Sequence, residues 1–282
     1  MIQKVKFNNI SIKIFKAEIT KNVLLCVHGF GGDKESSVIS GLGEELTKYN
    51  FSVVAFNLPC HGENDNSKIL NLNDCFDSFF TVLDFIKNES DLKNKKISIF
   101  ATSFGGFITL NCLSKTNLEF DKVILRAPAI FMDEVLINVL LPFQNLTIED
   151  LKEKTLNLGF ENNLLIDYNF YLDLCKNNLE KNFNYEKKLF IIQGRQDNIV
   201  DPVKNESFYK NPPVKLVVFH MRAKPFCYLR TPQGVTLFFH SHYFLNGSKY
   251  SFILIWSLII SSFSWFFTYS SIAFSFLPTV ST

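Results

Sequence analysis

Apolar runs of strand length recur along most of the chain, and two segments at its start alternate between apolar and polar residues instead. The alternating segments are residues 2–7 and 10–15, and the two asparagines between them, Asn8 and Asn9, predict a tight turn and an antiparallel hairpin. The later runs are short and nearly continuous, which is typical of buried parallel strands. They lie at residues 23–27, 51–56, 97–100, 123–125, 189–192 and 214–219.

Amphipathic stretches of helical length separate these runs, at residues 34–49, 73–88 and 104–114. Because strands alternate with helices, we predict an α/β fold with a mostly parallel sheet and helices on both of its faces. Residues 131–187 interrupt the alternation with helical patterns and no convincing strand, so we expect a helical cap over one end of the sheet. The core with its cap would span residues 1–219.

Composition excludes several other classes of protein. The chain has 282 residues, 47% hydrophobic and 20% charged, which is enough for a large core and unlike disordered, collagen-like or disulfide-scaffold chains. The net charge of +2 is too balanced for a nucleic-acid binder. The six cysteines form no CxxC pair, and the N-terminal segment has no apolar run typical of a secretory signal. We therefore expect no metal site and a cytoplasmic location.

Ser103 is the first candidate for chemistry. It lies in residues 101–106 (ATSFGG), between a predicted strand and a predicted helix. A sharp turn at a nucleophilic serine needs small residues two positions away on each side, and Ala101 and Gly105 meet that need. We predict that Ser103 is a nucleophile on such an elbow; a helix N-terminus capped by Thr102 or Ser103 is the simpler alternative.

A glycine-rich segment, residues 28–32 (HGFGG), follows the strand predicted at residues 23–27. It would leave the same edge of the sheet as Ser103, so the backbone N–H groups of Phe30 and Phe104 could hold the negatively charged oxygen that forms during acyl transfer. His28 would orient the loop. The alternative, a phosphate-binding turn, lacks the Gly-Lys-Ser/Thr ending of a P-loop and the spacing of a dinucleotide fingerprint.

Asp197 lies in residues 193–202 (QGRQDNIVDP), just after another predicted strand. A carboxylate at this edge can orient a histidine that accepts the proton of Ser103, and the order of serine before aspartate fits one hydrolase arrangement. A loop aspartate is otherwise most often a turn former or a helix cap. Asp201, directly before Pro202, fits that second role better.

Four segments together resemble the motifs of the α/β-hydrolase family, in particular its serine-esterase and aminopeptidase-like branch; they are residues 27–32, 57–63, 101–106 and 194–200. The resemblance covers about residues 1–219. It implies the α/β-hydrolase fold and a Ser-His-Asp mechanism without metal or organic cofactor. Asn57 stands where the family has the aspartate of Asp-x-Pro-Gly-His-Gly, and His61 is by resemblance a structural residue of that loop, not the catalytic base.

The family's catalytic histidine is the part of the pattern that this sequence lacks. In the family it follows the last strand within a few residues, in a glycine-rich loop, whereas this chain continues from residue 220 as HMRAKPF. His220, at the end of the last predicted strand, is the best-placed candidate for the base, and a strand-end histidine without a role is the alternative. His240 and His242 lie farther on, in an apolar stretch.

Residues 220–282 form an atypical tail. The chain has no acidic residue after Glu206, and residues 252–277 are uncharged. As a helix this segment would be about 39 Å long, enough to cross a hydrocarbon core of about 30 Å. A membrane anchor, a buried apolar appendage and a reading-frame change near residue 220 are the three explanations. We favour the frame change, because it accounts together for the missing histidine motif, the absent acids and the many serines and phenylalanines.

These observations predict a serine hydrolase that cleaves carboxylic esters of small or apolar substrates. Ser103, Asp197 and His220 would be its catalytic residues, and peptidase or thioesterase chemistry would use the same groups. The alternative, which follows from the missing base, is a catalytically silent hydrolase-like protein that binds a ligand. Such a protein could be held at a membrane by residues 252–277.

Overall fold

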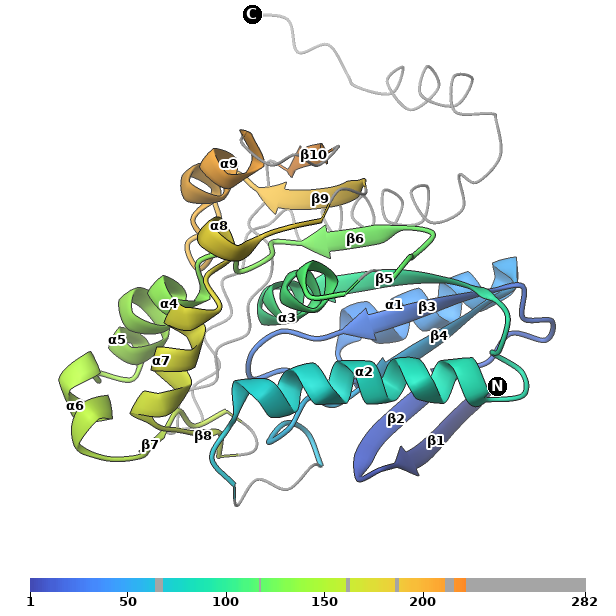
Figure 1. Cartoon of the computed structure of the whole chain (residues 1–282). Coiled ribbons are helices and arrows are strands. Elements are labelled where there is room, and N and C mark those ends of the chain that lie inside the picture. Colours follow the sequence, from blue (N-terminus) through green and yellow to red (C-terminus); the bar gives the residue numbers. More distant parts are fainter. Residues whose placement is uncertain (64–67, 117, 161–162, 186–187, 211–215, 222–282) are drawn as a thin grey trace, which may run out of the picture.

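The computed structural model of the chain describes residues 1–63, 68–116, 118–160, 163–185, 188–210 and 216–221, the last of these as backbone only. Its main feature is an eight-stranded sheet in the order β1-β2-β4-β3-β5-β6-β9-β10 (Figure 1). β1 pairs antiparallel with β2 and β2 antiparallel with β4, and the other pairs are parallel. The strands are β1 Ile2–Phe7, β2 Ile10–Phe15, β3 Asn22–Val27, β4 Phe51–Phe56, β5 Lys96–Thr102, β6 Val123–Arg126, β9 Leu189–Gly194 and β10 Leu216–Met221. The mostly parallel sheet predicted from the sequence is confirmed.

The register of the parallel strands aligns their carboxyl ends. Val27, the last residue of β3, lies opposite Phe56 of β4 and Ala101 of β5. Thr102, the last residue of β5, lies opposite Arg126 of β6. The loops that follow these strands therefore leave from one edge of the sheet, which is where ligands bind in open α/β folds.

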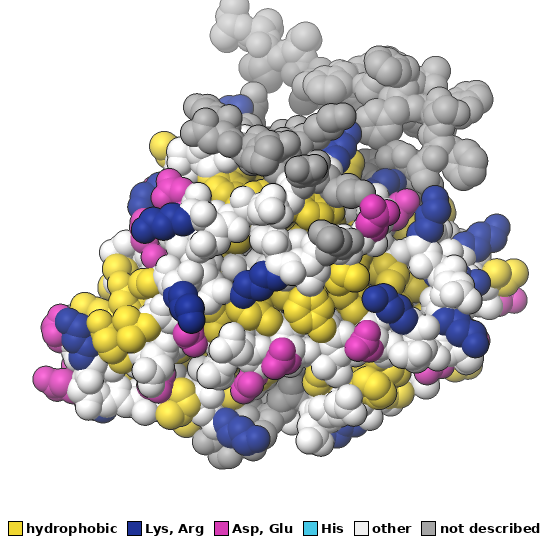
Figure 2. Space-filling view, in the orientation of Figure 1, with side chains coloured by type: hydrophobic (Ala, Val, Ile, Leu, Met, Phe, Trp, Pro, Cys, Tyr) yellow, Lys and Arg dark blue, Asp and Glu magenta, His cyan; other side chains and the backbone are white. Residues whose placement is uncertain are grey.

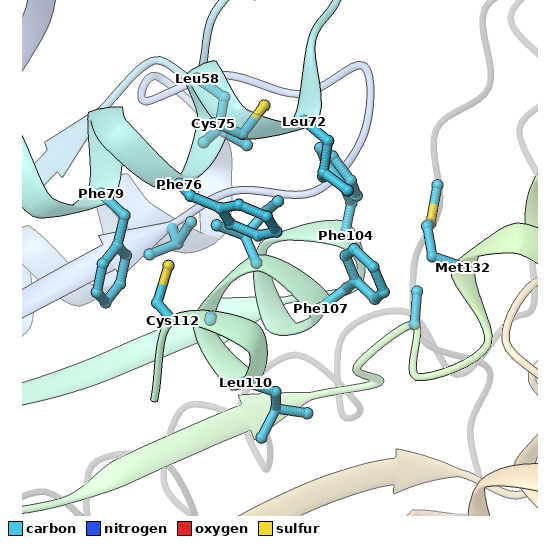
Figure 3. Packing of buried hydrophobic residues seen from close by; sticks show 14 of the residues in the cluster. Leu58, Leu72, Cys75, Phe76, Phe79, Phe104, Phe107, Leu110, Cys112 and Met132 are labelled. Atoms are coloured by element: carbon cyan, nitrogen blue, oxygen red, sulfur yellow. The ribbon is translucent and has the colours of Figure 1, made fainter. Parts of the chain in front are cut away.

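Helices cover both faces of the sheet. α1 (Ser37–Leu46) lies on one face, and α2 (Leu72–Asn88) and α3 (Phe104–Ser114) lie together on the other (Figure 1). Figure 3 shows apolar side chains of α2 and α3 packed between the two helices. α3 is buried on all sides over residues 104–113, because it lies between the sheet, α2 and the cap.

A cap lies between β6 and β9 along the chain. It contains α4 Met132–Val135, a π-helical turn Leu136–Leu140, α5 Leu141–Phe143, α6 Ile148–Glu153, α7 Tyr168–Lys176 and α8 Leu179–Asn182. It also contains two short antiparallel strands, β7 Leu156–Asn157 and β8 Leu165–Ile166. The expectation that this interval holds no strand was wrong, because a strand of two residues has no hydrophobic period to detect.

Charged and apolar side chains share the surface (Figure 2), and one more helix, α9 (Pro202–Lys210), follows the cap within the described residues. On the face seen in Figure 2, basic and acidic side chains are interspersed around apolar patches. α9 follows β9 and precedes β10. Among the described residues, no helix is long and apolar enough to cross a membrane. The proposed span at residues 252–277, and the rest of the chain after residue 221, lie outside them.

Candidate active site

Ser103 is the single residue between β5 and α3, and its backbone is strained. Its φ of 50° and ψ of −116° lie outside the regions that side-chain-bearing residues ordinarily occupy. Such a conformation costs on the order of 1–3 kcal/mol and persists only where the surroundings enforce it. The Ser103 side chain does not cap α3, so the simpler reading of a capping serine does not hold.

Backbone hydrogen bonds hold Ser103 in this turn. Its N–H donates to the carbonyl oxygen of Arg126 at 3.0 Å, and its carbonyl oxygen accepts from Ala129 at 3.0 Å and from Phe107 at 3.2 Å. The bonds to Arg126 and Ala129 tie the turn to the segment that follows β6. The strain is therefore offset by contacts with a neighbouring strand and loop.

The glycines around Ser103 permit a close approach of backbones. A Cβ atom at Gly105 would lie 2.5 Å from the carbonyl oxygen of Val27 and closer still to that of His28. A Cβ atom at Gly106 would lie 2.7 Å from the Cβ of Pro128. The end of β3 thus packs directly on the first turn of α3, and only glycine fits there.

The predicted oxyanion donors are the backbone N–H groups of Phe30 and Phe104. Phe104 is the first residue of α3, where helical N–H groups have no partner within the helix. Within the described part of the chain, neither amide donates to an acceptor. Gly29 brings the loop of Phe30 against Ser103, since a Cβ atom at Gly29 would lie 3.3 Å from the Cβ of Ser103 and 4.0 Å from its Oγ.

Two buried histidines join the loop of Phe30 to the neighbouring loop of residues 57–63. His28 Nε2 accepts a hydrogen bond from the Leu58 N–H at 3.0 Å, and His61 Nε2 accepts one from the Gly31 N–H at 3.1 Å. Each loop thus supplies a histidine that binds the backbone of the other. The Nδ1 atoms face carbonyl oxygens, those of Gly29 at 2.8 Å and Pro59 at 2.7 Å, so both rings carry their proton on Nδ1.

Burial keeps both histidines neutral, although the bonds to the carbonyl oxygens of Gly29 and Pro59 oppose the shift. Burial lowers the pKa of His28 to about 4, and the charge of Lys34 contributes to this shift. Burial lowers the pKa of His61 to about 3, and His28 contributes there. Because each Nε2 atom is already occupied by a backbone N–H, neither ring is free to take a proton from Ser103. This placement agrees with the orienting role expected for His28 and the structural role expected for His61.

Asn57 occupies the position of the family's aspartate and links two loops. Its Oδ1 accepts from the Lys34 N–H at 2.9 Å, and its Nδ2 donates to Glu63 at 2.7 Å. The buried ammonium of Lys34 also binds Glu63. An aspartate could not donate to Glu63, so the amide suits this carboxylate neighbour. Although burial opposes it, hydrogen bonds from Lys34 and Ser11 lower the pKa of Glu63 to about 2.

Asp197 is a buried carboxylate in the loop after β9. Its Oδ1 accepts from the N–H groups of Ile199 at 3.0 Å and Val200 at 3.1 Å, and its Oδ2 accepts from Gln193 Nε2 at 3.3 Å. Burial raises its pKa, and these hydrogen bonds together with the charge of Arg126 oppose the rise. The bonds to the N–H groups two and three residues further on are those of a turn-forming aspartate, and the orientation of a catalytic base by Asp197 stays a prediction.

Asp201 and His220 are the remaining predicted residues of this region. Asp201 caps α9, because its Oδ1 accepts from the Val203 N–H at 2.8 Å, which confirms the role expected for it. His220 belongs to β10, and the register places it opposite Gln193 of β9. Its side chain lies outside the description, as do His240 and His242, so the assignment of the base stays a prediction.

Aromatic residues of the cap lie over the loop of Phe30, a contact that the sequence did not reveal. The rings of Phe160 and Phe170 have centroids 5.7 and 6.2 Å from that of Phe30, and the ring of Phe104 lies at 5.4 Å. The Phe160 ring fills the space beside Gly31, where its Cγ would lie 2.7 Å from an added Cβ. The surroundings of the loop are therefore apolar and aromatic. No spacing in the sequence signals these contacts, because Phe160 and Phe170 are distant from residue 30.

The comparison with known families agrees with this geometry. The family described as alpha/beta hydrolase fold matches residues 22–184, and the chain belongs to that family. A comparison with curated proteins finds no match.

Several solved structures share the fold. Est1E from Butyrivibrio proteoclasticus is 16% identical over 92% of this chain and 99% of its own, with a TM-score of 0.61. Alpha/beta hydrolase domain-containing protein 10 from mouse is 13% identical over 79% of this chain and 90% of its own, with a TM-score of 0.59. An esterase from Pyrococcus furiosus is 17% identical over 79% of this chain and 82% of its own, with a TM-score of 0.55. At these identities the likeness concerns the fold alone.

Proposed function

We propose that this chain is a serine hydrolase that cleaves carboxylic esters. Ser103 Oγ attacks the ester carbonyl while a histidine takes its proton, and the alcohol leaves with that proton. Water then releases the acid from the acyl-enzyme by the same route. The observation that carries the proposal is the strained backbone of Ser103 at the end of β5, at the N-terminus of α3. The esterases among the structures that share this fold support the same class of reaction.

The negative oxygen of the tetrahedral intermediate would be held by the N–H groups of Phe30 and Phe104. Donors of this kind are effective when they are fixed in place before the reaction. The two loop histidines, His28 and His61, supply that rigidity, because each binds the backbone of the other loop. We therefore expect the site to be formed before substrate arrives.

His220 is the base that we propose, oriented by Asp197. It lies near the end of β10, beside the strand that leads into the loop of Asp197. Single changes of His220, His240 and His242 to alanine test the assignment. Replacement of the true base should lower kcat by several orders of magnitude, whereas replacement of an uninvolved histidine should leave kcat unchanged. Full activity of His220→Ala would show that another residue serves.

The substrate that we propose carries an apolar group beside the ester. The support is the group of rings around the oxyanion loop, to which the cap contributes Phe160 and Phe170. Rings of this kind bind apolar or aromatic groups by burial and by edge-to-face contact. Peptides and thioesters would react with the same catalytic residues and would differ from esters in the group that leaves.

The competing function is a catalytically silent binding protein, and the departure from the family's histidine motif after residue 220 favours it. A fluorophosphonate probe distinguishes the two. We expect a covalent adduct on the wild-type chain and hydrolysis of a short p-nitrophenyl ester, both lost in Ser103→Ala. Ser98→Ala, in the same strand, should keep both. A folded wild-type chain that neither forms the adduct nor turns over the ester would support the silent protein.

A further inference from the structure

A buried polar network lies beside Asp197. Its members Asn205 and Tyr209 lie outside the sequence motifs, and Gln193 begins the segment of Asp197. Gln193 of β9 and Asn205 of α9 are 0% and 1% exposed, and Tyr209 of α9 is 8% exposed. Asn205 Nδ2 lies 2.9 Å from the carbonyl oxygen of Pro128, 3.1 Å from Gln193 Oε1 and 3.1 Å from the Tyr209 hydroxyl. Buried polar groups of this kind are costly unless they are paired, so the network constrains the position of each member.

The network determines which way the Gln193 amide faces. Its Oε1 accepts from Asn205 and, at 3.4 Å, from the hydroxyl of Tyr209. Its Nε2 must then point away from them, toward Asp197 Oδ2 at 3.3 Å and the Val200 carbonyl oxygen at 3.5 Å. The opposite orientation would place an amide oxygen against a carboxylate and an amide hydrogen against the Asn205 donor. Asn205 thus makes Gln193 a donor to Asp197.

The same asparagine contacts the segment that holds the nucleophile. Pro128, whose carbonyl oxygen accepts from Asn205, packs against Gly106 in the first turn of α3. The next residue, Ala129, donates its N–H to the carbonyl oxygen of Ser103. One side chain of α9 therefore binds both the segment behind the serine and the amide beside the aspartate.

On the basis of the proposed function, we propose that Asn205 is a positioning residue that, through Gln193, directs the Asp197 carboxylate toward the catalytic histidine. A positioning role differs from a purely structural one in what its loss changes. Without Asn205, Gln193 Oε1 keeps the longer bond from the Tyr209 hydroxyl at 3.4 Å, so the amide is held less firmly as a donor to Asp197 Oδ2. The carboxylate then becomes easier to protonate and less well aimed, even if the fold persists.

The test compares full-length variants by two readouts. The first is the pKa of Asp197, followed by ¹³C NMR of aspartate-labelled protein and assigned with Asp197→Asn. The second is kcat and KM for a p-nitrophenyl ester. In Asn205→Leu we expect the pKa of Asp197 to rise by about one pH unit and kcat to fall at least about tenfold, with little change in KM. Circular dichroism establishes that each variant is folded.

Two controls separate this effect from a general disturbance. Asn111→Leu makes the same change at another buried asparagine, whose side chain donates to the Phe107 carbonyl oxygen of its own helix, and should leave both readouts as they are. Lys204→Ala removes the ion pair between α9 and Glu134 of the cap, and should do the same. Gln193→Met, which removes the donor itself, should reproduce the rise in pKa if Asn205→Leu does not fold.

The results separate a failure of the positioning role of Asn205 from a failure of the proposed hydrolase function. A folded Asn205→Leu with the Asp197 pKa and kcat of the wild type would overturn the positioning role, even if the pKa rises in Gln193→Met. If Asn205→Leu does not fold, an unchanged Asp197 pKa in Gln193→Met would overturn it. If the wild-type chain hydrolyses no ester, the proposed function fails. The NMR titration would then still show whether Asn205 governs the carboxylate.

Discussion

Replacement of Gly105 by alanine tests the close packing of β3 on the first turn of α3. In an ordinary helix this change is favourable by about 1 kcal/mol, because alanine has the better helix propensity. Here the added methyl would lie 2.8 Å from the carbonyl carbon of Val27 and 2.5 Å from its oxygen. These are backbone atoms in the middle of the sheet's edge, so they cannot rotate away as a side chain could.

The expected magnitude follows from these two opposing effects. Overpacking a well-packed site costs typically 1–3 kcal/mol, and overlap with backbone places this site at about the upper end of that range. After subtraction of the propensity gain, Gly105→Ala should destabilise the chain by about 2 kcal/mol. With an m-value of about 2 kcal/mol per molar urea, the unfolding midpoint would fall by about 1 M.

Urea unfolding followed by circular dichroism measures this change, and Gly32→Ala is the control. A methyl at Gly32 would meet its nearest neighbour, the Gly29 carbonyl oxygen, at 3.2 Å, so a small shift of the loop can accommodate it. We expect a loss below about 1 kcal/mol there. A Gly105→Ala chain as stable as the wild type, or more stable, would refute the close approach of β3 and α3.

Two further predictions concern stability. Glu63→Gln should lower the free energy of unfolding by about 1–2 kcal/mol, because it leaves the buried Lys34 ammonium without its carboxylate partner. The loss is smaller than for a fully buried ion pair, since the side chain of Lys34 is 1% exposed but that of Glu63 is 56% exposed. In urea unfolding, the double variant with Lys34→Met should recover most of this loss. His28 and His61 are neutral in the fold, with pKa values lowered by burial to about 4 and 3. Below about pH 6.5 the unfolded chain binds protons at these histidines, whereas the folded chain does not. The free energy of unfolding therefore falls as the pH falls below about 6.5, by about 1.4 kcal/mol per pH unit for each ring, until the pKa of that ring in the fold is reached. Below about pH 6.5 the melting temperature should depend less steeply on pH in His61→Gln than in the wild type. Equal slopes in the two proteins would contradict a buried, neutral His61 ring.

The fold was predictable because its signals are local. The hairpin strands and α3 have the bounds that the hydrophobic pattern indicates, since strand and helix periods are visible within six to eleven residues. The cap's two-residue strands, β7 and β8, are below that resolution. Likewise, α1 begins at Ser37, later than residue 34, because Ser36 accepts from the Ile39 N–H and so starts the helix there.

The site was predictable only where the motif itself defines the geometry. A small residue on each side of Ser103 indicates the turn, because the turn cannot form otherwise. The exchange of hydrogen bonds between the loops of His28 and His61 depends on how β3 and β4 lie side by side, which no spacing in the sequence reveals. Buried amides such as Gln193 and Asn205 are harder still to predict, because their partners come from three separate segments.

The backbone of Ser103 bears on the choice between a hydrolase and a silent binding protein. A conformation that costs on the order of 1–3 kcal/mol is a sizeable part of the stability of a domain, which is about 5–15 kcal/mol. A pocket that only binds a ligand gains nothing from raising a serine oxygen at the start of a helix, and a relaxed turn there would be more stable. A nucleophile would gain, because the turn places Oγ at the N-terminus of α3, beside the helix N–H groups that we propose hold the oxyanion. The strain at Ser103 therefore favours catalysis.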